Sequence, residues 1–117
     1  MTTPLPNADR AFIDERKIVG YLLSDSHPEG APKARFLKSF GFSAALPDIL
    51  RGALLDHATR HDPTSSRVTE FGSVFEINGR LTSPDGQNPW MLVVWMIDNG
   101  TDFPRFIIAV PSHEARP

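Results

Sequence analysis

The chain has 117 residues, of which 40% are hydrophobic and 22% are charged, and it contains no cysteine. Its length suits one domain, so we expect residues 1–117 to fold together, with residues 1–10 as a surface tail and residues 112–117 as a frayed C-terminus. The lack of cysteine excludes disulfide scaffolds and thiolate chemistry and is compatible with a reducing cytoplasm. The longest apolar run, residues 90–97, is too short to cross a membrane. We therefore expect a cytoplasmic protein, and its net charge of −2 gives no general affinity for nucleic acid.

The first half of the sequence predicts three helices. The first is expected over residues 15–23, where apolar residues at helical spacing form one stripe and Asp14 can act as N-cap. A short basic helix is expected over residues 33–40, with Pro32 in its first turn, where a backbone N–H would be unpaired in any case. Apolar residues at three- and four-residue steps predict the third helix over residues 47–60.

From residue 71 onward the apolar pattern changes to a period of two, which indicates strands. Residues 71–82 alternate between apolar and polar side chains, residues 90–97 are apolar on both faces as expected of a central strand, and residues 106–110 form a third strand. Residues 62–66 are rich in turn formers and predict a loop, while residues 11–13 could add a short strand. The predicted fold class is α+β, with about three N-terminal helices packed on one face of a three- to four-stranded antiparallel meander sheet.

The stretch over residues 26–42 carries the candidate anion-binding residues of the helical half. It opens with a turn at His27, because the proline that follows forces an extended backbone. The basic helix after this turn carries Lys33, Arg35 and Lys38, and no acidic residue lies within it. A histidine turn and a lysine at the start of a helix are thus close in sequence, inside the stretch that is best able to attract an anion.

His27 and Lys33 are the residues of this stretch that could act on a phosphodiester. A histidine titrates near neutral pH and can transfer a proton, while a lysine can stabilise charge that develops on a phosphate oxygen. Cleavage of RNA needs neither a metal nor a covalent enzyme intermediate, because the 2′-hydroxyl is itself the nucleophile. The alternative is structural, with His27 anchoring a turn and Lys33 lying on the surface.

Two arginines on the predicted sheet could extend such a site. Arg80 projects from the polar face of the first predicted strand, and Arg105 follows Pro104 at the start of the last. A sheet face that helices leave uncovered would hold these cations on a rigid support, which suits recognition of an anion. The alternative is a solvated face whose charges keep the protein soluble, and for Arg105 both interpretations stay open.

His57 and His61 are four residues apart on the third predicted helix, a spacing that can bring two imidazoles onto one metal ion. No third ligand is indicated, although Asp56 or Asp62 could serve, and Ala58 stands where a zincin motif has glutamate. His57 also continues an apolar stripe, which favours a histidine at the edge of the core with a local hydrogen bond. We predict no metal site, and we expect no cofactor because nucleophile-elbow and phosphate-loop motifs are absent from the sequence.

Several spaced segments resemble a family of small uncharacterised bacterial proteins. They comprise residues 5–23, 27–36, 93–100 and 104–111, which together span nearly the whole chain. Relatives of that family resemble the C-terminal toxin modules of large secreted bacterial proteins, and small stand-alone members sit beside a partner gene, as toxin–antitoxin pairs do. Toxin modules of this size are similar to the barnase–EndoU–colicin–RelE group of metal-independent ribonucleases. The resemblance implies a toxin-like protein with an antitoxin or immunity partner and an RNA substrate.

The motifs of this family can be placed on the chain residue by residue. This sequence departs from the family in the last strand, where relatives often carry a threonine and a tyrosine and this chain has Ile108 and Val110. If those polar side chains contact substrate in relatives, the site is altered here. The family's H-P-x-G-x-x-K-A and P-R motifs are intact, at His27, Pro28, Gly30, Lys33 and Ala34 and at Pro104 and Arg105.

Two hypotheses follow for the function. In the first, the protein is a toxin-like, metal-independent ribonuclease in which His27 is the general acid or base, while Lys33 and Arg105 stabilise phosphate charge. Arg35 and Arg80 would then help to position the RNA. In the second, the protein is a non-enzymatic domain that binds a protein or a ligand through its exposed sheet face or its most apolar strand. The first hypothesis requires the three catalytic candidates to meet around one pocket.

Overall fold

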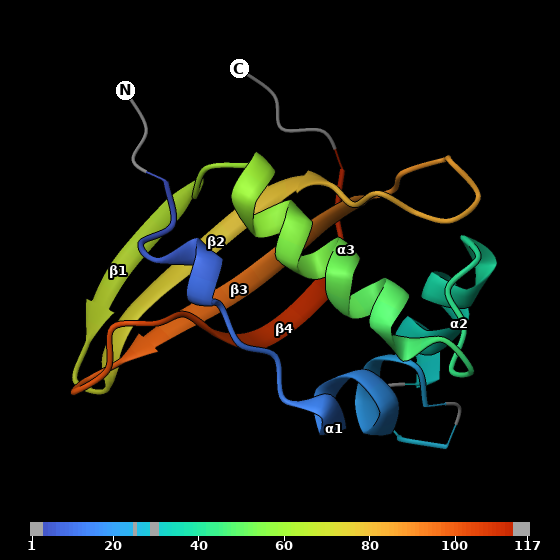
Figure 1. Ribbon diagram of the computed structural model, residues 1–117, viewed down its shortest axis with the longest axis horizontal. Coiled ribbons are helices and arrows are strands. Elements are labelled where there is room, and N and C mark those ends of the chain that lie inside the picture. The colour runs from blue at the N-terminus through green and yellow to red at the C-terminus, as the bar shows by residue number, and fades with distance from the viewer. Residues whose placement is uncertain (1–3, 25, 29–30, 114–117) are drawn as a thin grey trace.

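The computed structural model describes residues 4–24, 26–28 and 31–113, and Gly30 of the family motif lies outside them. The predicted α+β fold is confirmed, because the helices come first and four strands follow as an antiparallel meander in the order β1-β2-β3-β4 (Figure 1). None of the described helices combines the length and the apolar character that crossing a membrane requires. In chain order the elements are η1 (Ala8–Arg10), α1 (Glu15–Lys17), η2 (Ile18–Leu22), α2 (Ala31–Ser39), α3 (Pro47–Arg60), β1 (Ser65–Thr69), β2 (Gly72–Arg80), β3 (Trp90–Asp98) and β4 (Arg105–Pro111).

One face of the sheet carries the buried side chains of the hydrophobic core. On this face Ile77 of β2 and Val93 of β3 are directly opposite each other, and both are fully buried. Trp95 and Phe106 are paired in the same way across β3 and β4, with their rings in edge contact at a centroid distance of 5.7 Å. The alternation of side chains along each strand thus places the fully buried apolar residues on this face.

Helix α3 lies across this face of the sheet (Figure 1). Leu50 and Leu54, four residues apart on the helix, are fully buried. One turn further His57 is also buried, and its Nε2 lies 3.2 Å from the carbonyl oxygens of both Gly79 in β2 and Met91 in β3. Hydrogen bonding therefore adds to apolar packing where the helix meets these two strands.

The N-terminal segment, which the sequence predicts to be a surface tail, is attached to the core. Leu5 is only 3% exposed and belongs to the core. The 3-10 turn η1 follows, and Arg10 within it forms a 2.7 Å ion pair with Asp102. Most described residues of the segment are exposed, as expected of a surface segment, but its proline-rich, polar composition gives no sign that Leu5 attaches it to the core. Burial of a single leucine is worth about 1.5–3 kcal/mol, which is enough to attach a short segment to a domain.

The C-terminal end is attached to the sheet as far as it is described. The backbone N–H of Ser112 donates a 2.9 Å hydrogen bond to the carbonyl oxygen of Trp90, which extends the β3–β4 pairing by one residue. Asn78 of β2 donates through Nδ2 to the carbonyl oxygen of His113 at 3.2 Å. The remainder of the predicted frayed end, residues 114–117, lies outside the described chain.

The first predicted helix begins where expected and then changes type. Asp14 caps it, because its carboxylate accepts a 2.9 Å hydrogen bond from the backbone N–H of Arg16. After the single turn of α1 the chain forms the π-helix η2, in which the N–H of Leu23 donates to the carbonyl oxygen of Ile18 at 2.9 Å. Turns of this wide type are rare and often occur at functional sites. This one carries Tyr21 on the side of the molecule where β4 ends the sheet.

The structure adds strand β1 where the sequence predicts only a loop. It begins at Ser65, which lies opposite Glu76 of β2. Four of its five residues are exposed, so no alternation of apolar and polar side chains marks it in the sequence. Backbone pairing with β2 defines this strand. With β1 the sheet has four strands, the upper end of the predicted three to four.

The short strand expected over residues 11–13 is a single parallel bridge between Phe12 and Arg105. The N–H of Phe12 donates to the carbonyl oxygen of Pro104, and its own carbonyl oxygen accepts from the N–H of Phe106, both at 2.8 Å. These two bonds attach the N-terminal segment to the outer edge of β4. They also place the α1–η2 segment, which follows directly, beside that edge.

Candidate functional site

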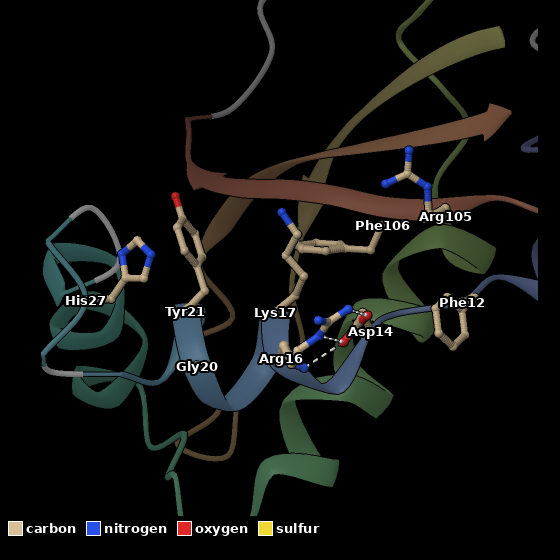
Figure 2. Close-up of a pocket in the computed structure, with 9 residues that line it drawn as sticks. All are labelled: Phe12, Asp14, Arg16, Lys17, Gly20, Tyr21, His27, Arg105 and Phe106. Atoms are coloured by element: carbon tan, nitrogen blue, oxygen red, sulfur yellow. Dashed lines mark hydrogen bonds and ion pairs between the residues drawn. The ribbon is translucent and has the colours of Figure 1, made fainter. Parts of the chain in front are cut away.

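A pocket of about 430 Å³ lies between the α1–η2 segment and the first residues of β4. Three short stretches of sequence contribute to it: the segment that bridges to β4 and continues into η2, the loop after η2, and the start of β4. Half of its polar side chains are cationic, and the remainder of the wall is largely aromatic. The lining residues are Phe12, Asp14, Arg16, Lys17, Gly20, Tyr21, His27, Arg105 and Phe106 (Figure 2).

Two of the three residues predicted to be catalytic, His27 and Arg105, line this pocket. They lie at opposite ends of the group, with Tyr21 and Lys17 between them (Figure 2). The ring of His27 contacts the ring of Tyr21 edge-on, at a centroid distance of 4.7 Å and an interplanar angle of 72°. The fold thus brings the histidine turn and the start of the last strand to one site, although they are far apart in the sequence.

The third predicted catalytic residue, Lys33, reaches the site through Tyr21 and does not line the pocket itself. Its Nζ donates a 2.7 Å hydrogen bond to the phenolic oxygen of Tyr21 and lies 4.8 Å from the centroid of that ring. Lys33 is in the first turn of α2, where the buried residues Ala34 and Leu37 hold the helix against the core. The lysine charge is therefore positioned beside the pocket by a packed helix.

Arg105 is held in a two-point ion pair with Asp98, the last residue of β3. Nε donates to Oδ2 at 2.9 Å and Nη2 donates to Oδ1 at 3.0 Å, which leaves the N–H groups of Nη1 outside the pair. This hydrogen bonding lowers the pKa of Asp98 and raises the pKa of Arg105 from their ordinary values. The pair fixes the orientation of the guanidinium at the pocket and offsets part of its charge.

Sequence reasoning missed two cations of the pocket, Lys17 and Arg16. Lys17 donates through Nζ to the carbonyl oxygen of Ile107 at 3.2 Å and lies 5.7 Å from the centroid of the Tyr21 ring. Arg16 instead bonds Asp14 through Nε and Nη2, at 3.1 and 2.8 Å, and these bonds lower the pKa of that carboxyl to about 2. The four-residue spacing of Lys17 and Tyr21 on the predicted helix indicates that they share a face, but nothing in the sequence marked Tyr21 as part of the site.

The residues predicted to position RNA, Arg35 and Arg80, do not line the pocket. Arg35 is exposed on α2, the helix that also carries the lysine of the site. Arg80 lies 5.5 Å from the ring of Trp90, at the end of β2 farthest along the sheet from the start of β4. Ile108 and Val110, where the chain departs from the family, lie farther along β4 and are not among the lining residues.

Both histidines of the predicted pair are hydrogen-bonded to backbone carbonyl oxygens, His57 in the core and His61 in the half-buried position that follows α3. A ring nitrogen that faces a carbonyl oxygen carries its proton, so Nε2 of His57 donates to Gly79 and Met91, and Nε2 of His61 donates to Arg80 at 3.0 Å. Neither of these nitrogens is then available to a metal ion. In the described part of the chain, no three histidine, cysteine, aspartate or glutamate side chains are grouped so that they could hold a metal.

The chemistry of the pocket suits a ligand that carries phosphate. Lys17, Lys33 and Arg105 bring positive charge from three different elements to the surroundings of a single tyrosine. Fixed cations attract an anion, and aromatic walls accommodate the planar groups of a nucleic acid. The attraction is local, because the chain as a whole carries a net charge of −2.

The fold is shared with a chain of the contact-dependent growth inhibition toxin–immunity protein complex from Klebsiella pneumoniae 342. The two chains superpose with a TM-score of 0.69 and 14% sequence identity, over 86% of this chain and 98% of that one. At this identity the likeness establishes the fold alone. No curated protein sequence matches the chain significantly. A family model described as a domain of unknown function, DUF6883, matches residues 4–113, and the chain therefore belongs to the DUF6883 family.

Proposed function

We propose that this protein is a toxin-like ribonuclease that cleaves RNA at the pocket without a metal ion. The observation that carries the proposal is that His27 and Arg105 line one pocket, with Tyr21 and Lys17 between them. A histidine supplies proton transfer near neutral pH, and fixed cations stabilise the charge that builds up on a phosphate during attack. The shared fold with a chain of a toxin–immunity protein complex supports the toxin-like part of the proposal.

In the proposed reaction the ribose 2′-oxygen attacks the adjacent phosphorus, and a 2′,3′-cyclic phosphate forms as the bond to the 5′-oxygen breaks. His27 takes the proton of the 2′-hydroxyl. Arg105, through the N–H groups of Nη1, and Lys17 bind the non-bridging phosphate oxygens, while Lys33 adds positive charge from behind Tyr21. The loss of one such donor typically lowers the rate of a comparable reaction by about 10²–10³-fold.

The two arginines outside the pocket would contact RNA that extends beyond the cleaved bond. Arg35 is exposed on the same helix as Lys33 and would meet a phosphate close to the site. Arg80 lies at the other end of the sheet, so it would contact only a longer RNA. Contacts of this kind raise affinity for any sequence and weaken as salt is added.

A ribonuclease of this kind would damage the cell that makes it, so we propose that a small antitoxin or immunity protein binds it. The similar chain was observed in a complex of a toxin with its immunity protein. A partner that covers the pocket would have to present acidic groups to Lys17 and Lys33, because uncompensated cations are costly to bury in an interface.

A second candidate function is that of a non-enzymatic domain that binds another protein. The complex that contains the similar chain holds both a toxin and an immunity protein, and the shared fold is compatible with either role. The sheet face opposite α3 also favours it, because Leu92, Val94 and Met96 of β3 are only half-buried there. Apolar side chains gathered on one face are typical of protein interfaces.

Expression in a bacterium separates the two candidates. For a ribonuclease, induction of the wild-type chain should arrest growth and fragment cellular RNA, and both effects should be relieved by His27→Ala and by Arg105→Gln. Arg67→Gln is the matched control, since Arg67 is an exposed residue of β1 outside the pocket, and this variant should stay as toxic as wild type. Normal growth with intact RNA after induction of the wild-type chain would exclude the ribonuclease and leave the protein-binding domain.

A further inference from the structure

We propose that Tyr21 is the second proton-transfer residue of the site and gives its phenolic proton to the departing 5′-oxygen. This inference rests on the proposed ribonuclease function. Cleavage of RNA by the 2′-hydroxyl needs one group to remove a proton from the nucleophile and another to protonate the leaving oxygen. His27 can serve only one of these roles in a single step, and neither Lys33 nor Arg105 was assigned the other.

The hydrogen bond between Lys33 and Tyr21 determines whether the phenolic hydroxyl can act as a hydrogen-bond donor to a ligand. A lysine ammonium has only donors, so the 2.7 Å contact means that Tyr21 accepts through its oxygen. The phenolic O–H is not used in this bond and can donate to a third group. Tyr21 lines the pocket, so that third group can be a bound ligand.

Three titratable groups face the tyrosine. The ammonium groups of Lys33 and Lys17 lie 4.8 and 5.7 Å from the ring centroid, and the ring of His27 lies 4.7 Å away in edge contact. When the phenol gives up its proton, the phenolate lies against an ammonium that is already in hydrogen-bonding contact. The negative charge produced by the step is thus met by fixed positive charge, without reorganisation of the site.

The π-helix keeps the phenol in place. Ile18 and Leu22 of η2 are fully buried, which attaches this turn to the core, and Tyr21 lies between them in sequence. Figure 2 shows its hydroxyl directed toward the β4 side of the pocket, the same direction as the tip of Lys17. A proton donor must be held within hydrogen-bonding distance of the leaving oxygen, and a side chain on a packed turn meets that need better than one on a loop.

No other lining residue is as well suited to the role. Asp14 is ionised, because its bonds to Arg16 lower its pKa to about 2, and it has no proton to give near neutral pH. Lys17 is bonded to a backbone carbonyl, and the loss of its proton would remove positive charge at the moment when negative charge develops. A phenol carries its proton at neutral pH and starts the reaction uncharged.

The proposed cleavage transfers one proton to His27 and one proton from Tyr21. The proton of the 2′-hydroxyl goes to His27, the 2′-oxygen forms a bond to phosphorus, and the bond from phosphorus to the 5′-oxygen breaks. The 5′-oxygen takes the proton of Tyr21 and leaves as an alcohol. The proton on His27 then returns to the phenolate of Tyr21 through solvent, so the enzyme is regenerated without any further reactant.

The test compares two substrates with the wild-type chain, Tyr21→Phe and His27→Ala. One is an oligoribonucleotide that the wild-type protein cleaves at a mapped bond. The other has sulfur in place of the 5′-oxygen at that bond, and a thiolate leaves without being protonated. Tyr21→Phe should lower the rate on the first by about 10²-fold or more, as expected for loss of a general acid. The Tyr21→Phe variant should cleave the sulfur substrate at close to the wild-type rate, whereas His27→Ala should cleave both substrates more slowly.

Tyr21 is the one tyrosine of the sequence, so 3-fluorotyrosine supplied during expression labels this site alone. The fluorinated phenol is more acidic, and the alkaline limb of the pH–rate profile should therefore move to lower pH. A purely structural role for the hydroxyl would not move this limb.

The outcomes distinguish a role of Tyr21 in proton transfer from the ribonuclease activity itself. Equal losses on both substrates would show that Tyr21 has a structural role, and an unimpaired Tyr21→Phe would show that the hydroxyl is not used. Either result overturns this inference while the ribonuclease stands on the loss seen with His27→Ala. If the wild-type protein cleaves no RNA, the proposed function fails and this inference fails with it.

Discussion

The imidazole of His61 packs directly against the backbone of Gly79, so closely that a Cβ at position 79 would lie 2.5 Å from Cδ2 of the ring. His61 is held there because its Nε2 donates to the carbonyl oxygen of Arg80 at 3.0 Å. The contact joins the C-terminal end of α3 to β2. It explains why a strand interior, where glycine is usually unfavourable, contains one at this position.

We predict that Gly79→Ala destabilises the protein by about 1–3 kcal/mol, the usual cost of inserting a methyl group into a packed site. The new Cβ would force the ring of His61 away from the strand and break its hydrogen bond to Arg80. The free energy of unfolding, measured in urea, checks this. If the variant is as stable as wild type, the ring of His61 can move away from the strand without loss of stability.

A second glycine provides the matched control, with the opposite expected sign. Gly52 lies in α3, and a Cβ there would meet no atom within 4 Å. Gly52→Ala should therefore stabilise the protein by about 0.5–1 kcal/mol, because alanine loses less conformational freedom than glycine in a helix. The same urea titration measures it, and a loss of stability would mean that the helix surface at position 52 is not open.

The stability of the fold should fall in mild acid because of His57. Burial, followed by the nearby His61, lowers the pKa of His57 to about 4. In the unfolded chain its pKa is near the ordinary value of about 6.5, so the unfolded state binds the proton first as pH falls. Stability is then lost between about pH 6.5 and pH 4 and amounts to about 3 kcal/mol at most, with no further contribution below that range.

Measurement of the free energy of unfolding from pH 7 to pH 4 checks this prediction. His57→Gln should be less stable at pH 7, since it disturbs bonds to two strands, but its stability should depend less on pH than that of wild type. His61→Gln is the control, because it removes the half-exposed histidine of the pair and should keep most of the slope. A slope that His57→Gln leaves unchanged would assign the acid sensitivity to another group.

The ion pair between Arg105 and Asp98 should limit the affinity of the pocket for RNA. Asp98→Asn leaves the guanidinium in place but removes the negative charge that offsets it. We expect this variant to bind a labelled single-stranded DNA, used as a probe that cannot be cleaved through a 2′-hydroxyl, more tightly than wild type. The plot of log affinity against log salt should steepen by up to about one unit.

Removal of the cation of this ion pair, by Arg105→Gln, serves as the comparison. Arg105→Gln removes the cation and leaves Asp98 without its ion-pair partner, so it should weaken binding of the same probe and make the salt dependence shallower. Fluorescence anisotropy at several salt concentrations measures both variants. If Arg105→Gln leaves the affinity unchanged, the guanidinium does not contact the phosphate, and weaker binding by Asp98→Asn would show that Asp98 supports binding by orienting Arg105.

Much of the fold could be predicted from local patterns. Apolar spacing located α3 and the core face of β2, because burial depends on which face of an element a side chain occupies. It also located β3 and β4 as strands, although β3 is apolar on both faces and its core face could not be chosen from the pattern. Strand β1 left no such pattern, since four of its five residues are exposed. The attachment of the N-terminal segment left no pattern either, since it depends on one buried leucine, Leu5, among polar residues.

For the candidate site, the sequence indicated the residue types, and the tertiary structure determined how they are arranged. The residue types alone identified His27, Lys33 and Arg105 as side chains able to act on a phosphate. Their spatial relationship was not encoded in any one stretch of sequence: the bridge between Phe12 and Arg105 brings the helical segment to the edge of β4, and Lys33 meets the site through Tyr21.

By itself, the sequence determined the order of helices and strands, the core faces of α3 and β2 and the chemical groups available. These properties depend on neighbouring residues and on hydrophobic periodicity. Only the tertiary structure decided that Lys17 and Tyr21 stand between the predicted histidine and arginine, and that the charge of Arg105 is shared with Asp98. Contacts between distant segments depend on how whole elements pack, and no local pattern of side chains specifies that packing.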